Sequence, residues 1–280
     1  AHLPARPGFL SMTHDFPVIA LMALLGLVCG SFLNVLIHRL PIMIEQSWAE
    51  PTSANAATLN LACPGSHCPS CQHPIAWRDK LPLLGFALLR GRCRHCNNRI
   101  SWQYPLIELL TSALFVWSLL THEQWSVALA WAGFAAALMA LAVIDARTTW
   151  LPDAITQPMT WAGLITAALG WTTVSLPASL AGAVAGYLCL WSVYWLFLLV
   201  TGKEGMGHGD FKLLAALGAW FGWQQLLAIV LIASVSGLLA ALWLMWRKQL
   251  PDNRQIAFGP FLALAGGWLL FFGAPASLTL

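Results

Sequence analysis

Uncharged apolar runs, separated by short polar segments, extend along most of the chain. A run of about twenty such residues crosses a lipid bilayer as one α-helix. The pattern predicts eight membrane-spanning helices, of which the sixth, near residues 209–221, is the shortest. The apolar segments are residues 16–37, 104–120, 126–144, 154–171, 178–200, 213–246 (two helices) and 257–273. The sequence "GWQQ" at residues 222–225 predicts the turn that divides the longest segment.

The composition supports the same fold class. Hydrophobic residues make up 59% of the 280 positions and charged residues only 9%, with a mean hydropathy of +0.70. A soluble domain carries about a quarter of its residues as charges. We therefore expect an all-α polytopic membrane protein that contacts lipid and has no nucleic-acid partner. Residues 1–11 precede Met12 and are interpreted as a cloning remnant.

The basic residues predict the orientation, because cytoplasmic loops are enriched in lysine and arginine. With eight spans, the basic residues beyond the remnant all fall on one side, and the connections on the other side have none. These basic residues are Arg39, Arg78, Lys80, Arg90, Arg92, Arg94, Arg99, Arg147, Lys203, Lys212, Arg247, Lys248 and Arg254. We expect the N-terminus outside and the large loop after the first helix in the cytoplasm.

Four cysteines in this loop form two CxxC pairs, "CPSC" and "CRHC". They are Cys68, Cys71, Cys93 and Cys96. Two such pairs typically bind a tetrahedral zinc ion as a closed structural site. The alternative is a redox dithiol or disulfides, which the reducing cytoplasm disfavours. Cys63 and His67 are the nearest substitutes if one of the four is not a ligand.

Two aspartates lie at the predicted cytoplasmic ends of different helices. Asp145 ends the third helix, and Asp210 opens the sixth after the glycine-rich "GMGHG". Ionisable groups at a membrane-spanning helix are costly and mark functional sites. Two carboxylates that share a site do not both ionise cheaply, so one can act as an acid while the other activates a water molecule. This is the chemistry of an aspartic protease.

The glycines before Asp210 have a use in this chemistry. Gly207 and Gly209 would let the backbone of a substrate approach the acid closely. The alternative is that Asp210 only caps the sixth helix, since aspartate is a favoured N-cap residue. The residues alone do not decide between the two interpretations.

Other polar residues near the predicted site also have two interpretations. Asp153 is a rival catalytic acid, although its position before the fourth helix favours an N-cap role. Glu108, one turn into the second helix, would either hydrogen-bond within the bundle or contact a substrate. Lys212 is a further candidate accessory group, and Glu204 is expected to be solvated in its loop.

Five motifs in this order resemble those of the type IV prepilin peptidases, the leader peptidase/N-methyltransferases that serve type IV pili and type II secretion. The resemblance runs from about Gly26 to Trp223. The motifs are "GSFLNVLIHRLP", the loop from "CPSC" to "CRHCNNRIS", "YPLIELLT", "IDARTTWLPD" and "GMGHGDFKLLAALGAWFGW".

The resemblance implies that Asp145 and Asp210 are the catalytic pair of a GxGD-type aspartyl protease, peptidase family A24, in a bacterial inner membrane. The implied substrates are prepilins and pseudopilins, whose short basic leader is cleaved after a glycine at the cytoplasmic face. The enzyme would then methylate the new N-terminal residue with S-adenosylmethionine. No Gly-rich binding motif for that cofactor is visible, so its site is unknown. The zinc ion is expected to be structural.

Two other classes of protein fit the sequence less well. A proton-coupled transporter would use Asp145, Asp210 and Glu108 as a relay, but such acids usually lie near mid-membrane between repeated halves. A membrane redox protein would leave the aspartates unexplained. The expected domains are a first transmembrane helix at 12–40, a cytoplasmic zinc-binding domain at 41–103 and a seven-helix protease domain at 104–280.

Overall fold

The computed structural model describes residues 15–48, 59–203, 205–247 and 257–273. The predicted cloning remnant, Glu204, Lys248 and Arg254 lie outside these residues. Regular structure in the described part is helical, and its only β pairing consists of two isolated bridges. The chain divides into two compact units, residues 1–136 and 137–280.

Five helices in the described part are long and apolar enough to cross a membrane. They are α1 (Phe16–Trp48), α3 (Gln103–Thr121), α4 (Trp125–Thr148), α6 (Leu176–Thr201) and α8 (Leu226–Trp246, with the preceding turn). The other three predicted spans also contain helices, but these have only 14 to 16 residues. They are α5 (Asp153–Ala168), α7 (His208–Phe221) and α9 (Gly259–Phe272). The all-helical fold is confirmed for the described residues, with five helices capable of crossing a membrane, whereas the count of eight spans stays a prediction.

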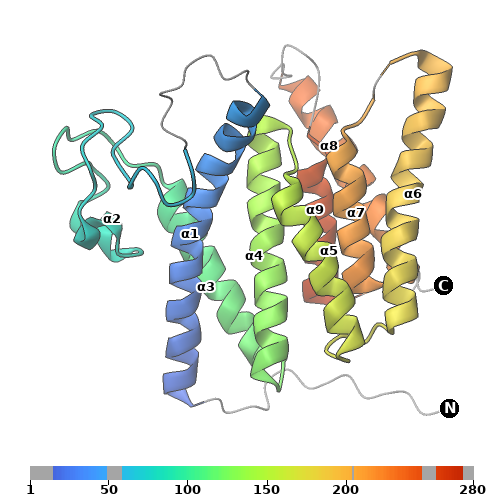
Figure 1. Ribbon diagram of the computed structural model, residues 1–280, viewed down its shortest axis with the longest axis horizontal. Helices are drawn as coiled ribbons and strands as arrows, with labels where there is room; N and C mark the ends of the chain where they lie inside the picture. The colour runs from blue at the N-terminus through green and yellow to red at the C-terminus, as the bar shows by residue number, and fades with distance from the viewer. Residues whose placement is uncertain (1–14, 49–58, 204, 248–256, 274–280) are drawn as a thin grey trace. The chain divides into compact units, whose positions relative to one another are not determined.

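In the first unit, α1 and α3 lie side by side (Figure 1). Glycines on α1 let the two backbones approach: a Cβ added to Gly26 would lie 2.6 Å from the Ser112 Cα, and one added to Gly30 would lie 2.7 Å from the Glu108 Cα. Small residues are the usual means of close helix packing in membranes. The contact fixes the second apolar helix of this unit against the first.

Helix α1 is longer than its apolar run predicts. It continues to Trp48 through Pro41, eleven residues beyond the predicted end at Ile37. An apolar run marks the part of a helix that lies in hydrocarbon, but the backbone hydrogen bonds can continue into water. The additional turns carry Arg39, which is buried and donates to the backbone carbonyls of the loop that leads to the cysteines. The acceptors are Asn60 at 3.0 Å, Leu61 at 3.3 Å and Pro64 at 2.6 Å.

The loop between α1 and α3 has little regular structure. Its described part contains a short 3₁₀ helix, η1 (Trp77–Lys80), and the one-turn helix α2 (Leu84–Leu88). The two isolated bridges, His67 with Pro74 and Arg92 with Arg99, each close a turn that carries one CxxC pair. A loop with so small an apolar core needs another source of stability.

In the second unit, α7 forms the centre, and α5, α6, α8 and α9 all contact it. Its residues from Asp210 to Trp220 are buried apart from Lys212. The backbones of α6 and α7 nearly touch, since a Cβ added to Gly182 would lie 2.2 Å from the Gly218 carbonyl oxygen. Helix α7 therefore has a fixed position among its neighbours.

Helix α7 ends at the predicted turn. Gly222 has a φ of 80°, which favours glycine, and the 3₁₀ turn η2 (Trp223–Gln225) leads directly into α8. At the same end, the Trp220 indole donates to the Met159 carbonyl of α5 at 2.8 Å, and the Ser179 hydroxyl of α6 donates to the Ala219 carbonyl. These bonds hold α7 along its axis and thereby fix the position of Asp210 at its other end.

Candidate active site

The second unit contains a pair of buried aspartates. Asp145 lies in the last turn of α4 and is 3% exposed, and Asp210 lies in the first turn of α7 and is 7% exposed. Their carboxyl groups are close enough to interact electrostatically. Asp145 Oδ2 and Asp210 Oδ1 are buried and have no hydrogen-bond partner within the described residues. The structure thus brings together the two aspartates that the sequence singled out.

Leu151, in the segment between α4 and α5, contacts the starts of both α7 and α9. A Cβ added to Gly209, the residue before Asp210, would lie 2.7 Å from the Leu151 Cβ, and Gly259 packs against the Leu151 Cδ1. Gly209 therefore permits close packing beside the acid. Gly207 is different, because it is exposed and an added Cβ would meet no atom within 4 Å. Of the two glycines, only Gly207 has an exposed backbone, and the role of both in substrate access stays a prediction.

The structure does not give Asp210 a capping role. The N-cap of α7 is Gly207, and Asp210 lies three residues further along, with its Oδ1 buried and without a partner among the described residues. A buried carboxyl oxygen without a partner costs free energy, and such groups in native proteins usually have a function. The pair is suited to hold a water molecule or a peptide carbonyl between its unpartnered oxygens.

Two of the predicted accessory residues pair with each other. Lys212 Nζ lies 2.6 Å from Asp153 Oδ1, and the Asp153 side chain is 53% exposed. The N-cap prediction for Asp153 is wrong, because Pro152 is the N-cap and Asp153 is the first residue of α5, with its carboxylate paired to Lys212. Aspartate is favoured throughout the first helical turn, so the sequence pattern could not separate these neighbouring positions.

Glu108, the third accessory candidate, belongs to the first unit. Its Oε2 accepts the backbone N–H of Leu83 at 2.8 Å, and its carboxyl group also hydrogen-bonds the Ser31 side chain of α1. Leu83 is the N-cap of α2 and has a φ of 56°. Of the two roles predicted for Glu108, the described contacts match the hydrogen-bonding one, which joins α1, α3 and the cysteine-bearing loop.

The four predicted metal ligands meet at one point of that loop. All four sulfur atoms lie within 4.8 Å of one another, with 3.8 Å between Cys68 Sγ and Cys96 Sγ and 4.0 Å between Cys71 Sγ and Cys93 Sγ. A tetrahedral site with Zn–S bonds of about 2.3 Å requires sulfur separations of about 3.8 Å. The four thiols therefore fit one zinc ion, and none of them is disulfide-bonded in the structure. Cys63 and His67 are not part of this cluster.

The two CxxC turns have the same backbone geometry. The residue after each second cysteine is left-handed, Gln72 at φ 57° and Asn97 at φ 56°, and donates its N–H to the carbonyl of the first cysteine of the pair. In the first turn, the backbone N–H groups of Cys71 and Ser70 lower the pKa of the Cys68 thiol to about 6. A thiol that ionises readily is a better metal ligand.

One residue beside the aspartates was missed. Gly259, the first residue of α9, is buried against Asp145: an added Cβ would lie 2.5 Å from the Asp145 Oδ2. Its only sequence signal is the pair Gly259–Pro260, because proline favours the first turn of a helix.

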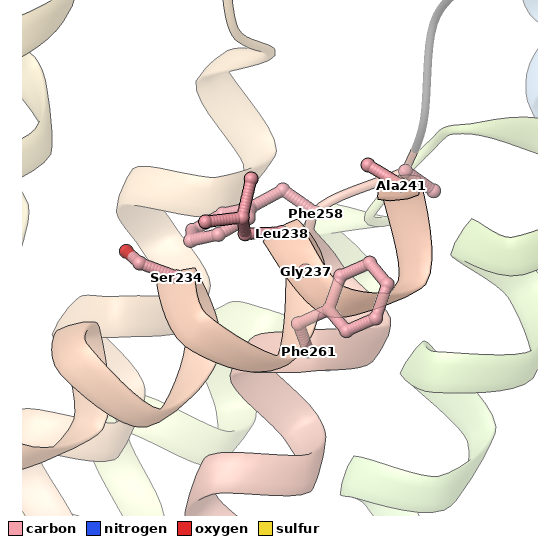
Figure 2. A pocket seen from close by; sticks show the side chains of 7 residues that line it. Ser234, Gly237, Leu238, Ala241, Phe258 and Phe261 are labelled. Atoms are coloured by element: carbon pink, nitrogen blue, oxygen red, sulfur yellow. The ribbon is translucent and has the colours of Figure 1, made fainter. Parts of the chain in front are cut away.

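An apolar pocket of about 330 Å³ opens near Gly259 between α8 and α9, as Figure 2 shows. Phe258 and Phe261, on either side of Gly259–Pro260, line that pocket.

The fold and these two centres define a helical protein with five helices apolar enough to cross a membrane, a buried aspartate pair and a four-cysteine cluster that could hold a metal ion. Two family models match the chain: the bacterial peptidase A24 N-terminal domain over residues 24–122, and the type IV leader peptidase family over residues 132–242. The chain belongs to the type IV leader peptidase family and is accordingly a peptidase. The resemblance identified from the motifs is confirmed.

Curated relatives are similar over nearly the whole chain. A prepilin leader peptidase/N-methyltransferase of Burkholderia pseudomallei (strain 1026b) is 47% identical over 94% of this chain and 88% of its own length. Proteins of the same name from Dickeya chrysanthemi (47%; 92% of this chain, 94% of the relative) and Aeromonas hydrophila (45%; 94% of each) are similar to the same extent. No solved structure matches the chain at a significant level.

Proposed function

We propose that this peptidase cleaves the short basic leader of type IV prepilins or pseudopilins after a glycine, at the cytoplasmic face of a bacterial inner membrane, and then N-methylates the new N-terminal residue with S-adenosylmethionine. The observation that carries the cleavage proposal is the buried pair Asp145 and Asp210, each with one unpartnered carboxyl oxygen. Family membership and the names of the relatives support the substrate class and the methylation.

The pair supplies acid and base to the reaction. One carboxylate is ionised and takes a proton from a water molecule, which attacks the scissile carbonyl. The other is protonated and donates its proton to the developing oxyanion. The first carboxyl group then passes the proton that it took from water to the leaving amine, and collapse of the tetrahedral intermediate returns the remaining proton to the second carboxylate. The two carboxyl groups interact, so their titrations belong to the pair. The exposed edge at Gly207 offers an extended substrate backbone a route to Asp210.

The metal has a structural role in this proposal. Cys68, Cys71, Cys93 and Cys96 would hold zinc with all four positions filled, which leaves no open position for water or substrate. When bound, the ion crosslinks the two CxxC turns of a loop with little apolar core. Arg39 and Glu108 then hold the loop to α1 and α3 through backbone carbonyl and N–H groups. The binding site for S-adenosylmethionine is not assigned to residues.

The proposed function is tested with a synthetic prepilin N-terminal peptide and purified protein in nanodiscs, with and without S-adenosylmethionine. Mass spectrometry follows the products of wild type, Asp145→Asn and Asp210→Asn. We expect cleavage after the leader glycine by wild type only, with losses on the order of 10²–10⁴-fold in each variant. The mass of one added methyl group should appear only with the methyl donor.

A second substrate separates folding from catalysis. A peptide that already lacks the leader should be methylated by both aspartate variants at the wild-type rate, because it needs no cleavage. Full leader cleavage by either variant would remove that aspartate from the pair. Failure of folded, zinc-loaded wild type to cleave several leaders would instead favour the proton-relay alternative.

A further inference from the structure

Helix α9 begins in direct contact with Asp145. A Cβ added to Gly259 would lie 2.5 Å from Oδ2 and 3.0 Å from Cγ of that aspartate. Real Cβ atoms do not approach other atoms to 2.5 Å, so any side chain at position 259 would turn the carboxylate away. Only glycine at position 259 therefore leaves room for the Asp145 carboxylate where the structure places it.

The first turn of α9 has few backbone N–H groups that could bind another group. The first N–H groups of a helix normally lack intrahelical partners. Here Pro260 has no N–H, and the N–H groups of Phe261 and Leu262 donate to the Phe258 carbonyl at 3.0 and 3.2 Å. The N–H of Gly259 is directed at the Asp145 carboxylate, to which it donates. A carboxylate that accepts from a helix N-terminus is stabilised by charge as well as by the hydrogen bond.

Ordinary packing does not account for this glycine. Gly266, two turns further along α9, meets only apolar atoms, because its added Cβ would lie 2.6 Å from Leu217 Cδ2 and 3.2 Å from Leu138 Cδ2. At Gly259 the nearest atoms belong to a carboxyl group that is 3% exposed and keeps one oxygen unpartnered. The position thus affects a reacting group rather than the hydrocarbon core.

We propose that Gly259 is a positioning residue for the peptidase reaction: its N–H and its missing side chain together fix the Asp145 carboxylate against Asp210. The inference rests on the function proposed above. It extends that function to α9, which lies outside the matched segments 24–122 and 132–242. Substrate would bind as before without this contact, but the attacking water would be poorly aligned.

The kinetic test compares Gly259→Ala with Gly267→Ala. Both add one methyl group to α9, but a Cβ at Gly267 meets no atom within 4 Å. We expect kcat for leader cleavage to fall on the order of 100-fold in Gly259→Ala, the scale of a misplaced catalytic group, with KM changed less than threefold. Gly267→Ala should match wild type. A kcat within threefold of wild type for Gly259→Ala, or a change in KM alone, would overturn the proposal.

A double-mutant cycle tests the contact without any activity. Gly259→Ala should lower the midpoint of thermal unfolding by about 2–4 °C in wild type but not in an Asp145→Ala background, where the obstructing carboxyl group is gone. An equal loss in both backgrounds would overturn the proposal, because it would mean that Gly259 is a packing residue only. The cycle measures stability and needs no leader cleavage. A wrong Gly259–Asp145 contact would therefore show in the unfolding midpoints, whereas a wrong peptidase proposal would show only in the cleavage assay.

Discussion

Lys212 binds both carboxylate oxygens of Asp153, with Nζ 2.6 Å from Oδ1 and 2.7 Å from Oδ2. The pair joins the first residue of α5 to the second turn of α7, two residues beyond Asp210. Asp153 is thus satisfied by a cation and half exposed, whereas Asp145 is buried with an unpartnered oxygen. The two rival aspartates of the "IDARTTWLPD" segment have different environments and different expected roles.

The first prediction is that Asp153→Asn keeps leader cleavage within about fivefold of wild type, because an exposed ion pair contributes about 0–1 kcal/mol. Initial rates of Asp153→Asn and Asp145→Asn, measured in one preparation series, check it. The result that contradicts this assignment is the reverse order, an inactive Asp153 variant beside an active Asp145 variant.

The second prediction concerns the closest helix contact. Gly182→Ala should destabilise the protein by about 1–3 kcal/mol, since the new Cβ would lie 2.2 Å from the Gly218 carbonyl oxygen. The intrinsic helix preference of alanine over glycine, about 1 kcal/mol, acts in the opposite direction. Unfolding in mixed detergent micelles measures the difference. Gly267→Ala is the matched control and should be neutral or stabilising; an equal loss in both variants would contradict the contact.

The third prediction concerns the metal. Wild type should bind one zinc ion per chain, and serine at Cys68 or Cys93 should abolish stoichiometric binding, because three thiolates leave the site incomplete. Elemental analysis of purified protein measures the metal. Cys63→Ser is the control, since that thiol lies in the same loop outside the cluster and should keep full occupancy. Zinc loss in the Cys63 variant would show that the ligand set is assigned wrongly.

The fourth prediction is a pH dependence in the same loop. Arg94, inside the second CxxC pair, donates to both oxygens of Asp79 at 2.6 and 3.0 Å and lowers the pKa of that carboxyl group. A lowered pKa in the folded state means that the pair contributes stability above the unfolded pKa, about 3.9, and loses it as the pH falls through the folded value. The unfolding midpoint of wild type should therefore exceed that of Asp79→Asn by a constant amount between about pH 5 and 8.

The same difference should shrink below about pH 4, where the wild-type carboxylate takes up its proton. Arg94→Gln should lose the same stability over the same range, since it removes the other partner. Protonation of the cysteines affects all three proteins at acid pH and cancels in the comparison. A difference that persists unchanged at pH 3.5 would mean that the ion pair is not its source.

Helices and metal ligands were largely predictable because their signals are local. Each predicted apolar segment contains a helix, since a chain in lipid must satisfy its backbone within the segment. The CxxC spacing predicted the cysteine cluster because one tight turn brings both thiols of a pair together. The extension of α1 to Trp48 was not predicted, because it depends on Arg39 meeting the carbonyls of Asn60 and Pro64 in a later segment.

The surroundings of the aspartates were predictable only in part. Asp145 and Asp210 were singled out since each is a rare acid at a helix end. The contact with Gly259 joins residues far apart in the chain, and a glycine before a proline has many local explanations. The bond from Leu83 to Glu108 depends in the same way on tertiary structure. Periodicity and spacing do not encode contacts of this kind.

The short helices have a consequence for the bilayer itself. Helices α7 and α9 have 14 residues each and α5 has 16, so at 1.5 Å per residue they extend about 21–24 Å, against about 30 Å of hydrocarbon. Helix α7 is enclosed by its neighbours, so lipid would meet mainly the other two short helices. If all three cross the bilayer as predicted, lipid beside α5 and α9 would thin, or the helix ends would lie below the headgroups. Asp210 and Gly259 lie at two of those ends. In that arrangement a thicker bilayer would reduce the access of water to the aspartate pair without changing a single residue.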